Sequence, residues 1–191
     1  EFFIYMDTHS KMTLDGVGMK VPEKHQSVIG MSASELSIQN STIFSKIDLS
    51  EGSKLTLENV HIEKFGNNTI HAKDSEVIAK NSTITGGDLE KDFPPVWLRN
   101  VIWESENCKI ELPTGTGICL DNNVQFNSDS DRMTSINSYN SMIRAHQATF
   151  SECLCVYEES FASLTGETTF LNENAQTISF GVFDAGVMMA E

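Results

Sequence analysis

A short pattern recurs along most of this chain of 191 residues. In its first clear copy, residues 36–43, apolar and polar residues alternate, an Asn follows, and an apolar residue returns three positions later. The equivalent positions are separated by 19, 22, 19, 22, 24 and 21 residues, counted along Asn40, Asn59, Asn81, Asn100, Asn122, His146 and Glu167. A period of about 20 residues that persists over this length is typical of a repeat architecture.

Each copy predicts two strands joined by a corner. Apolar residues that alternate with variable ones, many of them β-branched, are typical of a strand with one buried face. Asn tolerates the left-handed backbone region better than most residues, so it suits the corner. Further apolar segments, such as 47–49 and 110–112, supply a third strand. Three strands in about 20 residues make one coil, and stacked coils enclose a continuous core.

A β-sandwich also has short strands at regular spacing and is the alternative fold. A sandwich does not require the same residue type at one corner of five consecutive units, so we favour a β-solenoid with about seven coils of 19–24 residues.

The Asn corners, the coil length and the segment 12–19 (Met-Thr-Leu-Asp-Gly-Val-Gly-Met) resemble the right-handed, single-stranded parallel β-helix of the pectate-lyase-like superfamily. The resemblance covers roughly residues 10–180 and is carried by a degenerate repeat. It implies an all-β, right-handed parallel β-helix. That superfamily includes polysaccharide lyases and hydrolases, phage tailspikes and bacterial surface passengers, and one fold can host all these functions.

The repeat also divides the chain. We expect residues 1–33 to form an opening strand and an irregular first coil that caps the solenoid. Residues 34–180 form the parallel β-helix, and residues 181–191 form a C-terminal strand or cap, or a junction to a further domain. Both ends look cut from something longer, because solenoid ends normally need caps.

Charge restricts the partners. The formal net charge is −14, which argues against nucleic acid and against an anionic membrane surface. No apolar run reaches the roughly 20 residues that a membrane-spanning helix needs, so we expect no membrane insertion.

The four cysteines are expected to be structural thiols, and their redox state stays open. Alternation places Cys108 in the core and Cys119 on the outside, and it points Cys153 and Cys155 the same way along one strand. Their spacing matches no zinc site.

One outward column of the predicted sheet is polar in its first coils and apolar in the later ones, and its apolar part is our candidate binding surface. We assign Ile78, Trp97 and Ile143 to it, and we expect the protruding segment 86–95, with Asp92 and Phe93, to lie near it. An exposed apolar patch usually marks an interaction site. We expect the 86–95 segment to cover this patch, with a neighbouring subunit or a sugar ring stacked on Trp97 as the alternatives.

Catalytic and metal sites are weakly indicated. The acid pairs and the Gly-His-Gly and Arg-x-Lys motifs expected of the pectin hydrolases are absent, as is the pair of strand-borne arginines of the lyases. If the chain is an enzyme, Glu104 and Glu106 are the candidate catalytic carboxylates. Asp129 and Asp131 are a Ca²⁺ candidate, but two carboxylates are few, and we favour a solvated turn without metal. We predict no cofactor.

These observations favour a non-enzymatic solenoid segment of a surface or secreted adhesin, or of a viral fibre, that presents loops to a protein or a polysaccharide. It would be extracellular, on a cell surface or on a virion, either as a homo-oligomer such as a trimer or as part of a longer chain. The alternative is a polysaccharide lyase or glycoside hydrolase with its site on an outer strand face near Trp97 and Glu104.

Overall fold

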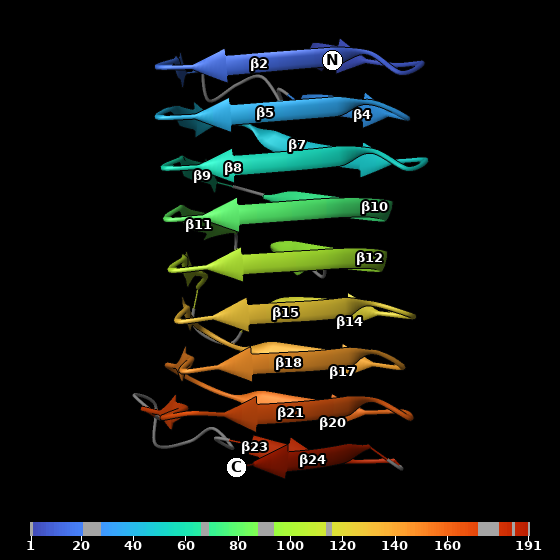
Figure 1. The fold of residues 1–191 in the computed structure, drawn as a ribbon, viewed down its shortest axis with the longest axis vertical. Helices are drawn as coiled ribbons and strands as arrows, with labels where there is room; N and C mark the ends of the chain where they lie inside the picture. The colour runs from blue at the N-terminus through green and yellow to red at the C-terminus, as the bar shows by residue number, and fades with distance from the viewer. Residues whose placement is uncertain are drawn as a thin grey trace.

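The chain folds into a right-handed parallel β-solenoid (Figure 1). The computed structural model describes residues 2–20, 28–65, 69–87, 94–113, 116–171, 180–184 and 186–190. Every strand pairing in these residues is parallel, which excludes the β-sandwich alternative. The described residues contain no helix, and therefore none that could span a bilayer.

The strands stack in three columns, two in a 16-stranded sheet and one in an 8-stranded sheet. The first column contains β1 (Phe2–Met6), β4 (Val28–Ser32), β7 (Lys46–Ser50), the first halves of β10 (Ile70–Lys80) and β12 (Val96–Glu106), β14 (Ile118–Asp121), β17 (Ile136–Tyr139), β20 (Leu154–Tyr157) and β23 (Phe180–Val182). The second contains β2 (Lys11–Asp15), β5 (Glu35–Gln39), β8 (Lys54–Glu58), the second halves of β10 and β12, β15 (Gln125–Asp129), β18 (Met142–His146), β21 (Phe161–Thr165) and β24 (Val187–Ala190). The third contains β3 (Gly18–Lys20), β6 (Thr42–Phe44), β9 (His61–Phe65), β11 (Thr83–Gly87), β13 (Lys109–Glu111), β16 (Arg132–Met133), β19 (Thr149–Phe150) and β22 (Thr169–Phe170).

Each coil takes one strand from each column. The described strands form eight such coils, and β23 and β24 belong to a ninth. The second to eighth coils, from β4 to β22, correspond to the seven that the repeat predicts. The first coil, β1 to β3, stacks on the second with the same parallel pairing.

The core is built from inward residues that stack on their equivalents in the next coil. In the second column the register aligns the buried residues Leu36, Leu55, Val77, Trp103, Phe126, Ile143 and Ala162. The rings of Trp103 and Phe126 stack with their centroids 5.6 Å apart. Period-two alternation therefore places one apolar ladder behind each strand column, and each coil depends on its neighbours to bury it.

The structure corrects the predicted corner ladder. All five predicted Asn corners have a positive φ, between 48° and 65°, but they occupy two different corners. Asn40, Asn59 and Asn81 follow the second column, whereas Asn100 and Asn122 follow the first. Because Lys80 pairs with Glu106, the true equivalent of Asn81 is Asn107, with a φ of 53°. Both corners need a left-handed residue between alternating strands, so the local pattern is the same at each.

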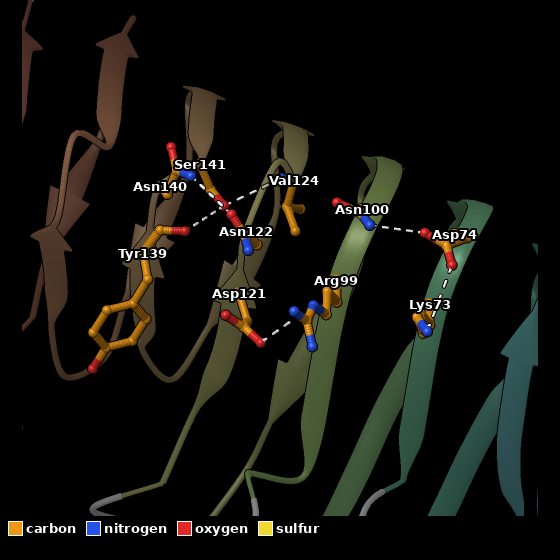
Figure 2. Close-up of polar contacts among 10 residues, drawn as sticks. All are labelled: Lys73, Asp74, Arg99, Asn100, Asp121, Asn122, Val124, Tyr139, Asn140 and Ser141. Carbon is orange, nitrogen blue, oxygen red and sulfur yellow. Dashed lines mark hydrogen bonds and ion pairs between the residues drawn. The ribbon is translucent and has the colours of Figure 1, made fainter.

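Side chains link successive coils at the first corner (Figure 2). The Nδ2 group of Asn100 donates to Asp74 at 2.8 Å, and that of Asn140 donates to Asn122 at 2.8 Å. The Ser141 hydroxyl accepts from the Val124 amide at 3.2 Å, so it satisfies a backbone donor that the corner leaves unpaired.

We predict that Asn107→Ala lowers the free energy of unfolding by about 1 kcal/mol, because a Cβ without a compensating local bond is strained at positive φ. Asn107→Gly should be close to neutral. Urea unfolding followed by circular dichroism measures both, and Asn137→Ala, on strand β17 and outside the corners, is the control. Equal losses for Ala and Gly at position 107 would show that the Asn side chain, and not the backbone conformation, matters there.

Candidate functional site

A shallow hollow of about 370 Å³ lies on the outer face of the second column, and we call it the polar groove. It crosses four neighbouring strands, β12, β15, β18 and β21. Its outward residues form two rows across these strands. The first row consists of Glu104, Asn127, Arg144 and Ser163, and the second consists of Glu106, Asp129, His146 and Thr165. All of them line the hollow except Glu106, which lies just outside it. Ser105, Ser128 and Ala145 line the hollow between these rows. The groove therefore presents carboxylate, amide, guanidinium, imidazole and hydroxyl groups within one patch.

Polar contacts order the second row. His146 Nδ1 and the Thr165 hydroxyl lie 2.9 Å apart. Lys80 Nζ lies 2.9 Å from Glu106, and the hydrogen bond to this carboxylate raises the pKa of Lys80. A second hollow of about 200 Å³ continues across β10, where Ile78, Lys80 and Glu106 line it together with Glu104 and Asp129. The patch thus carries both signs of charge.

The two candidate catalytic residues lie on this surface. Glu104 and Glu106 are both exposed on β12, two residues apart and on the same side. Glu104 lines both hollows, whereas Glu106 lines only the smaller one and is paired with Lys80.

Trp97 lies on a different face. It belongs to the first column, where it pairs with His71 and Cys119 and not with Ile78. Its ring stacks on His71 with the centroids 4.7 Å apart. The sequence predicts that Trp97 and Glu104 lie near one another, but the structure separates them, because β12 turns a corner at Asn100 between them.

His71 completes a small polar cluster beside Trp97. Asp48 lies 3.1 Å from His71 Nδ1 and 2.8 Å from Lys46 Nζ. Burial acts to raise the pKa of Asp48, but the hydrogen bonds and charges of His71 and Lys46 outweigh it and lower the pKa below its ordinary value. This cluster keeps Asp48 ionised and holds the imidazole against the indole.

The other predicted binding residues do not form a patch. Ile143 was predicted to face outward, but it is 0% exposed and stacks on Phe126 inside the core. The prediction was wrong by one residue of register, which exchanges the two faces of a strand. Ile78 does face outward and is half-buried, as a neighbour of Glu104. Asp92 and Phe93 lie outside the described residues.

The sequence favours a solvated turn over a Ca²⁺ site at Asp129 and Asp131, but of the two only Asp129 is solvated. Asp129 is exposed in the polar groove, whereas Asp131 is 1% exposed and faces inward. Asp131 accepts hydrogen bonds from the Ser105 and Ser128 hydroxyls and from the Cys108 amide. Burial raises the pKa of Asp131, although these hydrogen bonds oppose the shift. No cluster of three or more metal-ligating side chains occurs in the part of the chain that the structure describes.

The cysteines lie where alternation predicts. Cys108 is buried and Cys119 faces outward, half-buried, and burial raises the pKa of each thiol to about 11. Cys155 on β20 and Cys153, just before that strand, lie on the same side of the chain with their sulfur atoms 3.9 Å apart. The hydrogen bond that they share lowers the pKa of Cys155 to about 6 and raises that of Cys153.

Sequence reasoning missed Asn127, Arg144 and His146 as surface neighbours of Glu104. His146 was assigned to a corner, and the strand that contains Arg144 was placed one residue out of register. The signal that could have found them is the step from Trp103 to Phe126 to Ile143, three apolar residues whose outward neighbours are the groove residues.

No protein-family model matches the chain, and no curated protein matches it. Among solved structures the chain is similar to QnrB1, a plasmid-mediated fluoroquinolone resistance protein, at 10% sequence identity and a TM-score of 0.24, over 97% of this chain and 91% of that chain. A superposition this loose carries no argument about function, and the resemblance to the pectate-lyase-like superfamily stays a prediction.

Proposed function

We propose that this protein is a non-enzymatic β-solenoid that binds a polysaccharide in the polar groove. The proposal extends to its setting: an extracellular adhesin segment or viral fibre of the pectate-lyase-like type. The observation that carries it is the groove across β12, β15, β18 and β21. Neighbouring strands are about 4.8 Å apart, so the groove spans roughly 14 Å along the solenoid axis, which suits an extended polymer.

The chemistry of the groove suits sugar hydroxyls. Asn127, Ser163 and Thr165 can both donate and accept hydrogen bonds, and Arg144 donates several in a fixed geometry. Glu104 and Asp129 accept. Because the chain carries a net charge of −14, a neutral polymer is favoured over a polyanion.

The exposure of the carboxylates to solvent favours binding without cleavage. Glu104, Glu106 and Asp129 are all exposed, whereas the general acid of a glycosidase usually sits in an apolar or partly buried pocket. Glu106 is also held by Lys80.

A glycoside hydrolase is the second candidate, because Glu104 and Asp129 line the same two hollows from neighbouring strands. Two carboxylates that flank one groove are the minimum that such an enzyme requires.

One experiment addresses both candidates. The protein is incubated with a panel of neutral and acidic polysaccharides, and both retention on the polymer and release of new reducing ends are recorded. We expect retention of a neutral polymer, no new ends, and at least a tenfold loss of affinity in Asn127→Ala and in Arg144→Ala. Thr56→Ala is the matched control, because Thr56 occupies the same outward row as Asn127 but lies outside the groove.

New reducing ends that disappear in Glu104→Gln would establish the hydrolase instead. If Thr56→Ala weakens retention as much as Asn127→Ala does, the polymer binds elsewhere on the solenoid. If the protein retains no polymer at all, the proposal is rejected.

A further inference from the structure

A pair of thiols on the first column is separate from the polar groove. Cys155 lies on β20, and Cys153 is two residues before it on the same side of the chain. Cys153 is half-buried and Cys155 is 8% exposed. Both are free cysteines, and a hydrogen bond joins their sulfur atoms across 3.9 Å.

The backbone around the two thiols is fixed on both sides. The Cys153 carbonyl accepts from the Ile136 amide at 3.0 Å, and the Val156 carbonyl accepts from the Phe183 amide at 2.8 Å. Cys155 itself pairs with Asn137 in the preceding coil and Gly181 in the following one. The separation of the thiols is therefore set by the parallel ladder.

This separation is unfavourable for a disulfide. Alternate residues of an extended strand have Cα atoms about 6.6 Å apart, near the upper limit for a disulfide, and their Cβ atoms point in parallel. The sulfur atoms, at 3.9 Å, would have to approach to about 2.05 Å. Such an approach would bend β20 against its ladder bonds.

The same separation suits two ligands of one metal ion. With Zn–S bonds of about 2.3 Å, two sulfur atoms 3.9 Å apart subtend an angle of roughly 116° at the metal, close to a tetrahedral angle. Thiolates are soft ligands that select thiophilic ions such as Zn²⁺ over Ca²⁺ or Mg²⁺. No movement of the strand is needed for this geometry.

We propose that Cys153 and Cys155 form a two-thiolate chelate for a thiophilic, tetrahedral cation of the Zn²⁺ and Cd²⁺ class. Each thiol that is protonated releases its proton to solvent as its sulfur bonds to the metal. Among the described residues no His, Asp, Glu or further Cys joins this pair as a third ligand, so we expect water to complete the coordination. The partly open Cys153 is the side from which the ion enters.

The test is a titration of the fully reduced protein with Cd²⁺, read by thiolate-to-metal charge-transfer absorption in the ultraviolet, with Zn²⁺ as competitor. We expect one Cd²⁺ per chain, displaced by Zn²⁺, and at least a hundredfold loss of affinity in Cys153→Ser and in Cys155→Ser. Cys119→Ser is the matched control, since Cys119 occupies the same outward row two coils earlier, and it should bind as the unaltered protein does. Circular dichroism checks that each variant is folded, and Cys153→Ala replaces any serine variant that is not.

Two results would overturn the proposal. One is Cd²⁺ absorption that persists in Cys155→Ser or disappears in Cys119→Ser. The other is that the unaltered protein binds no Cd²⁺, while oxidised glutathione readily converts the pair to an intramolecular disulfide. In that reaction glutathione accepts the two electrons, and the protein loses the mass of two hydrogens.

Discussion

Replacing Trp103 with alanine is expected to lower the free energy of unfolding by about 3–5 kcal/mol, the usual cost of removing a large buried aromatic side chain. Trp103 is 0% exposed and lies in the fifth coil, aligned with Val77 in the coil before and Phe126 in the coil after. Its Nε1–H group donates to the Ser105 hydroxyl at 2.9 Å. The substitution would leave a cavity in the middle of the stack and weaken the contacts of two neighbouring coils, and solenoid stability depends on such contacts.

The measurement is urea unfolding followed by far-ultraviolet circular dichroism, because removing a tryptophan alters the fluorescence signal. Trp97→Ala is the matched control, since Trp97 is the other of the 2 tryptophans and lies half-buried on the outer face. We expect it to cost about 1 kcal/mol, from lost contact with the His71 ring. Similar losses in the two variants would contradict the inward and outward assignments on β12.

The contrast between these two tryptophans shows what alternation can predict. The pattern places Trp97 outward between the inward residues Val96 and Leu98, and the structure agrees. A period-two pattern, an apolar face and a left-handed corner were therefore sufficient for the parallel solenoid and most of its core. These features are local, and each recurs in every coil.

The position along a coil could not be predicted in the same way. Asn100 and Asn107 both end an alternating segment at positive φ, and only strand pairing shows that Asn107 is the equivalent of Asn81. The strands β10 and β12 each continue through the first corner, at Asp74 and Asn100, so the same kind of left-handed residue marks both corners and does not tell them apart. Pairing between coils is a non-local property, and one sequence contains no direct record of it.

This difference decides which residues of the polar groove could be placed from the sequence. The outward position of Glu104 could be predicted because it lies on a strand with clear alternation, and that prediction needs no neighbouring strand. Arg144 and His146 were missed as its neighbours because a shift of one residue in β18 reversed its two faces. A surface assembled from four coils requires all four registers to be right.

Replacing Asp131 with alanine is expected to lower the free energy of unfolding by about 2–4 kcal/mol, because it removes a buried acceptor from several donors. The Cys108 amide donates to Oδ1 of Asp131 at 2.7 Å, and the Ser128 hydroxyl donates to Oδ2 at 2.8 Å. The Ser105 hydroxyl also donates to Oδ2, and it accepts a hydrogen bond from Trp103. The hydroxyls can reorient, but the Cys108 amide is fixed by the backbone and would lose its acceptor. Asp131→Asn keeps an acceptor oxygen in the same place and should cost less at neutral pH.

The pH dependence of these variants tests the state of the carboxyl group. Burial raises the pKa of Asp131 above its ordinary value of 3.8, so its protonated form is favoured by folding. The part of its contribution to stability that depends on protonation is therefore full below pH 3.8 and is lost as the pH rises through the raised pKa of the folded state. Asparagine does not titrate, so the unfolding free energy of the unaltered protein minus that of Asp131→Asn should decrease as the pH rises through this window. If that difference instead increases with pH, the three donors outweigh burial and hold Asp131 as a carboxylate inside the corner.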